Sequence, residues 1–176
     1  MKIVYFVFTI FLLGLLPVSE TNDIIVKPGS IDKLFIGMDS LEVVKIYDSS
    51  QLNPVSYYNE LWGAYESYIR INFGGGNSIT ADLNSSKIYR LRAEGDRFVT
   101  EKGIRWGQNF FDIKEKYTNY EVDQGEEMGP PFIILDTGIA FELDQTELWF
   151  ERGYEKEQFH LFIDSSMTIN SLIVFK

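Results

Sequence analysis

The chain has 176 residues, of which 45% are hydrophobic and 15% aromatic, and this composition is enough for the core of one domain. Its formal net charge of −10 makes nucleic-acid binding and peripheral membrane binding unfavourable, because phosphate groups are repelled. It contains no cysteine, which excludes disulfides, thiolate catalysis and cysteine-based zinc sites.

The first segment differs from the rest of the chain. Met1 and Lys2 precede an apolar run from Ile3 to Leu16, and Pro17 follows it. This pattern is typical of a secretory signal peptide, so we assign residues 1–20 to one and expect a secreted or periplasmic protein. The run is shorter than the roughly 20 apolar residues that a spanning helix needs. Membrane contact is therefore expected only through an uncleaved signal segment.

After an extended leader over residues 20–30, one pattern occurs twice at constant spacing. It covers Lys33–Tyr47 and Gly103–Tyr117. Each copy predicts a short helix with a capping residue, Asp39 or Asn109, and an acidic residue three positions later that can complete a capping box. The expected core-facing stripes are Leu41, Val44 and Tyr47 in the first helix, and Phe110, Ile113 and Tyr117 in the second.

Each helix is followed by segments that alternate between apolar and polar residues, as strands do. In the first copy the expected strands are 69–73, 79–83 and 87–94, with turns at 74–76 and 84–86. In the second copy they are 132–135, 138–143, 161–166 and 169–174, with an insertion over 144–159.

These elements predict an α+β fold built from two repeats, residues 31–100 and 101–176, within one globular domain. Each repeat is a short helix plus a three- or four-stranded antiparallel meander. We expect the two meanders to share one antiparallel sheet, with the helices on one face. The other face would be partly open and would carry side chains such as Tyr68, Arg70 and Glu142.

The repeated motif, Ile36-Gly37-x-Asp39 and Trp106-Gly107-x-Asn109 with the helices that follow, also resembles known proteins. A single copy is similar to the unit of the outer-membrane-assembly lipoproteins of the SmpA/OmlA type. Two copies resemble the secreted β-lactamase inhibitor proteins, whose tandem repeats share one antiparallel sheet. The resemblance covers nearly all of residues 31–176 and implies binding of other proteins through an open sheet face and its loops. The lack of cysteine departs from both groups, so no functional residue is carried over.

An aromatic run precedes the first alternating strand and is the main candidate for a binding surface. It consists of Tyr57, Tyr58, Trp62, Tyr65 and Tyr68, and Trp149 in the insertion is a further candidate. Aromatic residues dominate protein-binding hot spots because they bury a large area with few rotors. A core role is the alternative, but rings on both faces of a strand exceed what a core requires.

The candidates for catalysis have structural explanations. Asp136-Thr137-Gly138 looks like an aspartic-protease triplet, but a turn between two strands explains it. His160, the only histidine, lies in an alternating segment, and the acidic loop with Asp123 and Glu126 matches no EF-hand spacing. The sequence therefore predicts a non-enzymatic binding protein with a protein partner and with no cofactor or metal. Its role would be inhibition, immunity or envelope assembly. The alternative is a small hydrolase or carbohydrate-binding module that uses the aromatic surface and the acidic loop.

Overall fold

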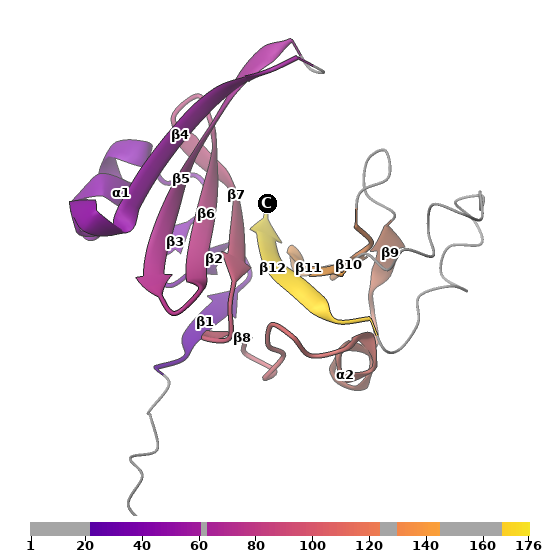
Figure 1. Ribbon diagram of the computed structural model, residues 1–176. Helices are drawn as coiled ribbons and strands as arrows, with labels where there is room; N and C mark the ends of the chain where they lie inside the picture. Colours follow the sequence, from indigo (N-terminus) through magenta and orange to yellow (C-terminus); the bar gives the residue numbers. More distant parts are fainter. Residues whose placement is uncertain (1–21, 61–62, 124–129, 145–166) are drawn as a thin grey trace, which may run out of the picture.

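The computed structural model describes residues 22–60, 63–123, 130–144 and 167–176. Within these ranges the chain has a mixed α+β fold with two α-helices and two sheets (Figure 1). The α+β class agrees with the sequence, whereas a second sheet was not expected. The assigned signal peptide, residues 1–20, lies outside the described residues. Across the described ranges, no helix has both the length and the apolar character needed to cross a membrane.

In the part of the chain that the structure describes, the larger sheet has eight strands, and every pair of neighbours is antiparallel. Its first half runs in chain order and its second half in reverse order, so that the last strands of the two halves pair in the middle. In spatial order the strands are β4 (Leu52–Asn59), β5 (Ala64–Gly74), β6 (Asn77–Asn84), β7 (Lys87–Glu94), β12 (Ile169–Phe175), β11 (Ile139–Leu143), β10 (Phe132–Ile134) and β9 (Glu121–Asp123).

One face of this sheet forms the core. The strand register places one apolar residue from each strand in a continuous row: Leu52, Ile71, Ile79, Ala93, Leu172, Phe141, Ile133 and Val122. The six central members are buried, and the two members on the edge strands pack against the core. Because successive side chains of a strand point to opposite faces, the residues that precede and follow each member of this row along its strand lie on the opposite face.

The smaller sheet has the order β3 (Leu34–Phe35), β2 (Ser30–Ile31), β1 (Ile24–Lys27) and β8 (Phe98–Thr100). Strand β1 pairs with β8 in parallel. It occupies part of the segment that the sequence suggested was a leader. This segment forms a strand because its side chains alternate: Ile24 and Val26 are buried, whereas Ile25 and Lys27 are exposed. Those two buried side chains anchor the start of the described chain in the core.

Two short helices contribute to the same core. Helix α1 spans Ser40–Ile46 and α2 spans Phe110–Lys116. Asp39 caps α1 by accepting a hydrogen bond from the backbone N–H of Leu41, and Asn109 and Asp112 form a capping box at α2. The stripe predicted for α2 is confirmed, since Phe110 and Ile113 are buried and Tyr117 packs against the core.

The stripe predicted for α1 is largely wrong. Leu41 is 67% exposed and Val44 is 50% exposed, whereas Val43 is fully buried. The physical reason is the helix's rotation: Val43 faces the core together with Met38 before the helix and Tyr47 after it. A helix of seven residues can direct only one such narrow stripe toward the core.

Strands β4 and β5 form a hairpin that projects beyond the rest of the sheet (Figure 1). Strand β4 was not predicted, because it is an edge strand with no buried residue and with Pro54 in it. The two predicted turns are present, at 75–76 and 85–86, and residues 136–138 turn between β10 and β11. After η1 (Ser49–Gln51), the chain enters β4 and leads directly into the hairpin.

Candidate binding face

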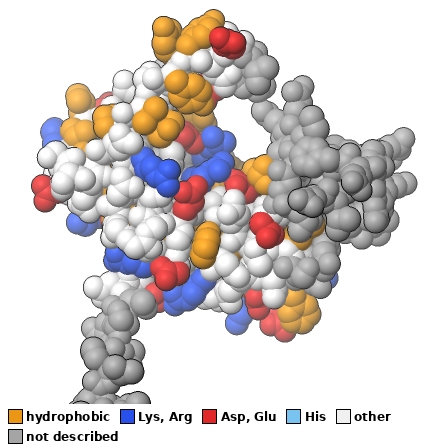
Figure 2. Space-filling model, viewed as in Figure 1, with side chains coloured by type: hydrophobic (Ala, Val, Ile, Leu, Met, Phe, Trp, Pro, Cys, Tyr) orange, Lys and Arg blue, Asp and Glu red, His pale blue; other side chains and the backbone are white. Residues whose placement is uncertain are grey.

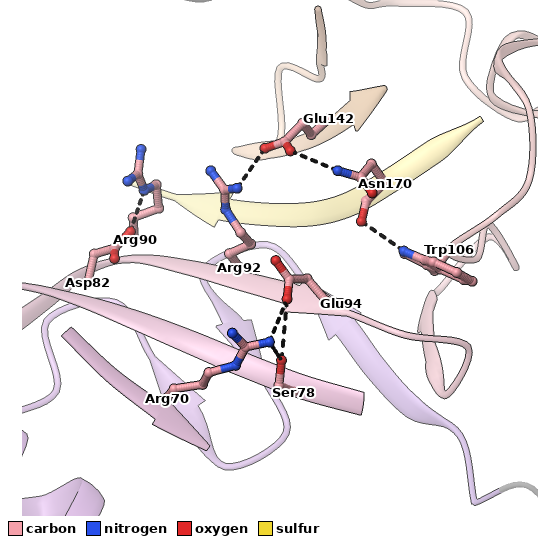
Figure 3. A network of polar contacts seen from close by, with 9 residues as sticks. All are labelled: Arg70, Ser78, Asp82, Arg90, Arg92, Glu94, Trp106, Glu142 and Asn170. Carbon is pink, nitrogen blue, oxygen red and sulfur yellow. Dashed lines mark hydrogen bonds and ion pairs between the residues drawn. The ribbon is translucent and has the colours of Figure 1, made fainter. Parts of the chain in front are cut away.

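The face of the large sheet opposite the core row carries mainly polar side chains, and we call it the open face. On β7, Arg90, Arg92 and Glu94 alternate with the buried Leu91 and Ala93. The register sets them beside polar residues of β6, which in turn lie beside Tyr68, Arg70 and Asn72 of β5. Figure 3 shows the arginines and carboxylates of this face interleaved across the strands.

Ion pairs link strands across the open face, one between the neighbours β6 and β7 and one from β5 across β6 to β7. Arg90 donates from Nε to Asp82, its cross-strand partner on β6. Arg70 Nη2 lies 3.0 Å from Glu94 Oε2 and also donates to Ser78 Oγ at 3.0 Å. These pairs are partly exposed, so they order the side chains more than they stabilise the fold.

One ion pair on this face is much less accessible. Glu142 is only 4% exposed, and its Oε2 lies 2.9 Å from Arg92 Nη1. Its Oε1 accepts a hydrogen bond from Asn170 Nδ2 at 3.3 Å, and Trp106 Nε1 donates to the backbone oxygen of Asn170 at 2.8 Å (Figure 3). Arg92 on β7 thus reaches across β12 to a carboxylate on β11.

The projecting hairpin carries tyrosines on both of its faces. Tyr58 and Tyr65 are cross-strand partners on the side that continues the core face, and their ring centroids lie 5.3 Å apart in an edge-to-face arrangement. Tyr57 and Tyr68 lie on the side that continues the open face, at 6.4 Å. Tyr57, Tyr58 and Tyr65 are 44%, 52% and 78% exposed. The hairpin extends past the core, so rings that would otherwise be covered remain accessible.

A shallow depression of about 480 Å³ lies where the hairpin joins the open face. Figure 2 shows apolar side chains at the projecting end and a mixed group of basic and acidic side chains below it. The residues that line the depression include Tyr57, Tyr65, Glu66, Tyr68, Asp82, Tyr89, Arg90, Arg92 and Glu94. Such an open, polar surface suits contact with a macromolecule better than enclosure of a small ligand.

Glu66 is held at the hairpin side of the depression. The Tyr57 hydroxyl donates to Glu66 Oε2 at 2.6 Å, and Asn59 Nδ2 donates to Glu66 Oε1. These two hydrogen bonds lower the pKa of Glu66, and the bond to Glu66 raises the pKa of Tyr57. At neutral pH Glu66 is therefore a carboxylate, which suits it to accept hydrogen bonds rather than to act as a general acid.

The structure brings together Tyr57, Tyr58, Tyr65 and Tyr68, four of the six residues proposed from sequence. Trp62 and Trp149 lie outside the described residues, as do Glu126 and His160. Asp123 ends β9, at the opposite edge of the sheet from β4, so the structure does not bring it beside the tyrosines.

Sequence reasoning missed Tyr89, Arg90 and Arg92. The alternation of 87–94 did predict their strand, but not that β7 would pair on both sides in the middle of the sheet. Arg90 also lies over the Tyr89 ring, with its Cζ 5.7 Å from the ring centroid. Among the described residues no group of three or more histidine or acidic side chains could hold a metal ion.

No family model matches the chain, and a search of curated proteins finds no match. Among solved structures, the chain is similar to the crystal structure of the uncharacterized protein yfeY from Escherichia coli, with a TM-score of 0.57 and 12% sequence identity. The similarity covers 88% of this chain and 99% of that chain. At this identity the comparison shows a shared fold alone.

Proposed function

We propose that this chain is a secreted or periplasmic, non-enzymatic binding protein that recognises another protein through the β4–β5 hairpin and the adjoining open face. The observation that carries the proposal is the exposure of tyrosine rings on both faces of a projecting hairpin. Exposed aromatic rings ordered by mutual contact present a large binding area at low entropic cost. Inhibition, immunity towards a toxin and envelope assembly are the roles that fit such a surface.

The same proposal includes a duplicated fold, with repeats over residues 31–100 and 101–176. It is supported by the order of elements, since α1 precedes the meander β4–β7 and α2 precedes the strands β9–β12. It is also supported by the caps, since Asp39 and Asn109 occupy equivalent positions of the repeated motif and both cap a helix. In this view the hairpin is an extension that distinguishes the first repeat from the second.

Site-specific photocrosslinking tests the binding surface. A benzophenone amino acid placed at Tyr58 is exposed to an envelope extract, and the same group at Phe111 on α2 serves as the control. The two positions are matched, because Tyr58 is 52% exposed and Phe111 is 51% exposed. We expect a discrete protein adduct from Tyr58 that is weak or missing from Phe111.

The double variant Tyr58→Ala/Tyr65→Ala completes the test. It should keep the circular dichroism spectrum of the parent, because both side chains lie beyond the core. It should also fail to compete for the partner captured through the Tyr58 adduct. Equal adducts from both crosslinking positions, or full competition by the double variant, would show that the hairpin is not the binding surface.

A further inference from the structure

We infer that the depression beside the hairpin receives a basic side chain, lysine or arginine, from the protein partner. This inference rests on the proposed function, because it names the chemistry of the group that meets the tyrosine surface. It is carried by an imbalance among the charged groups of the depression. The arginines there are matched by carboxylates, whereas Glu66 is held by neutral groups.

The arginines of the open face already have anionic partners. Arg70 is paired with Glu94, Arg90 with Asp82, and Arg92 with Glu142. An anionic ligand would have to compete with these intramolecular carboxylates and would approach others that repel it. The depression is therefore poorly suited to a carboxylate or phosphate.

Glu66 is in the opposite situation. Both of its hydrogen-bond donors, Tyr57 and Asn59, are neutral, and among the described residues it forms no salt bridge. Arg90 is near enough to favour the ionised form of Glu66, but its Nε donates to Asp82. A carboxylate has about four acceptor sites, so two fixed donors leave room for a third. Tyr57 and Asn59 thus orient the carboxylate without neutralising it.

The surroundings of Glu66 suit the rest of a basic side chain. Tyr57 is its direct cross-strand neighbour, and Tyr68 follows two residues later on the same face. Tyr65 also lines the depression. Ring faces attract an ammonium or guanidinium group, and the aliphatic stem of lysine or arginine packs on the same rings. The net charge of −10 would also attract a basic partner over a longer range.

Selection from a phage library of random linear peptides tests the inference without knowledge of the natural partner. The purified chain is the target, and peptides are retained only if Tyr57→Ala/Tyr68→Ala, which removes the two rings on the same face as Glu66, reduces their binding. We expect these peptides to be enriched in lysine or arginine next to an apolar residue. A synthetic peptide from the selection is then titrated against the parent, Glu66→Gln and Glu115→Gln. Glu115 is an exposed carboxylate on α2, so its variant controls for the loss of one negative charge.

The affinity should fall about tenfold with Glu66→Gln and change less than about twofold with Glu115→Gln. Hairpin-dependent peptides without an excess of basic residues would overturn this inference and leave the proposed function standing. Equal affinities of the peptide for the parent and for Glu66→Gln would also overturn this inference and leave the proposed function standing. If no selected peptide depends on the hairpin tyrosines, both the inference and the proposed function are contradicted. Circular dichroism establishes that each variant is folded.

Discussion

Replacing Arg92 by methionine tests whether the buried carboxylate of Glu142 depends on its arginine partner for the stability of the sheet. The side chain of Glu142 is 5% exposed and that of Arg92 is 29% exposed. Removing one partner of a fully buried pair costs about 3–5 kcal/mol, because the remaining charge loses its compensation. Arg92 is partly accessible and water can replace some of its interaction, so we expect a loss of about 2 kcal/mol. Among the described residues, the hydrogen bond from Asn170 would then be what the carboxylate retains.

Arg70→Met is the matched control, because Arg70 is also paired on the open face but is 45% exposed, with Glu94 at 36%. Its cost should be about 0.5 kcal/mol. Urea unfolding, followed by tryptophan fluorescence and far-UV circular dichroism, gives both values if the slope with denaturant is unchanged. The double variant Arg92→Met/Glu142→Met should recover most of the loss, since no charge is left buried. If Arg92→Met costs no more than Arg70→Met, the buried carboxylate does not depend on its arginine.

Two further predictions concern the backbone and the pH dependence. Gly95 has a φ of +113°, and a Cβ added to it would lie 2.9 Å from Asn77 Cα. Gly95→Ala should therefore lower the free energy of unfolding, measured with urea, by about 2–3 kcal/mol. Gly103→Ala, with φ of +82° and open space around it, should cost only about 1 kcal/mol, and equal costs would contradict the role of the close approach. Burial and the 2.7 Å hydrogen bond that the Tyr47 hydroxyl donates to Asp32 raise the pKa of Tyr47 above its ordinary value of 10.0. The protonated hydroxyl therefore contributes its full stability below pH 10, and this contribution is lost progressively as the pH rises from 10 toward the raised pKa. Tyr47→Phe should cost about 1 kcal/mol at neutral pH, and its unfolding free energy should fall less steeply than that of the parent above pH 10; parallel pH profiles would contradict this assignment.

The sequence predicted the elements that follow strong local rules and missed those that depend on distant pairing. The capping residues and the stripe of α2 were predictable because they are set within one or two turns of chain. The stripe of α1 was also predictable in principle: the repeat aligns Val43 with the buried Ile113, and Leu41 with the exposed Phe111. Comparing the two copies residue by residue would have favoured Val43 over Leu41.

The candidate site was predictable only in part. The tyrosines were visible because they are concentrated in a short stretch, and their presence on both faces of one hairpin agrees with the excess of rings over what a core requires. The charged residues of the depression could not be predicted from the sequence. Arg90 and Asp82 come together through the pairing of β6 with β7, and the contact of Arg92 with Glu142 requires β12 to lie between β7 and β11. Local patterns predict a strand and its faces but not its neighbours.

The pairing of β7 with β12 also has a consequence for folding kinetics. Hairpins such as β4–β5 join residues that are close in sequence, whereas Ala93 pairs with Leu172 across a long intervening chain. The entropy lost in closing that chain makes this junction a slow step, and it is also short, with four paired residues on each strand. Until it closes, β7 presents an unpaired edge that another copy of the chain can meet. If the two halves form before they join, this edge is where we expect aggregation to begin.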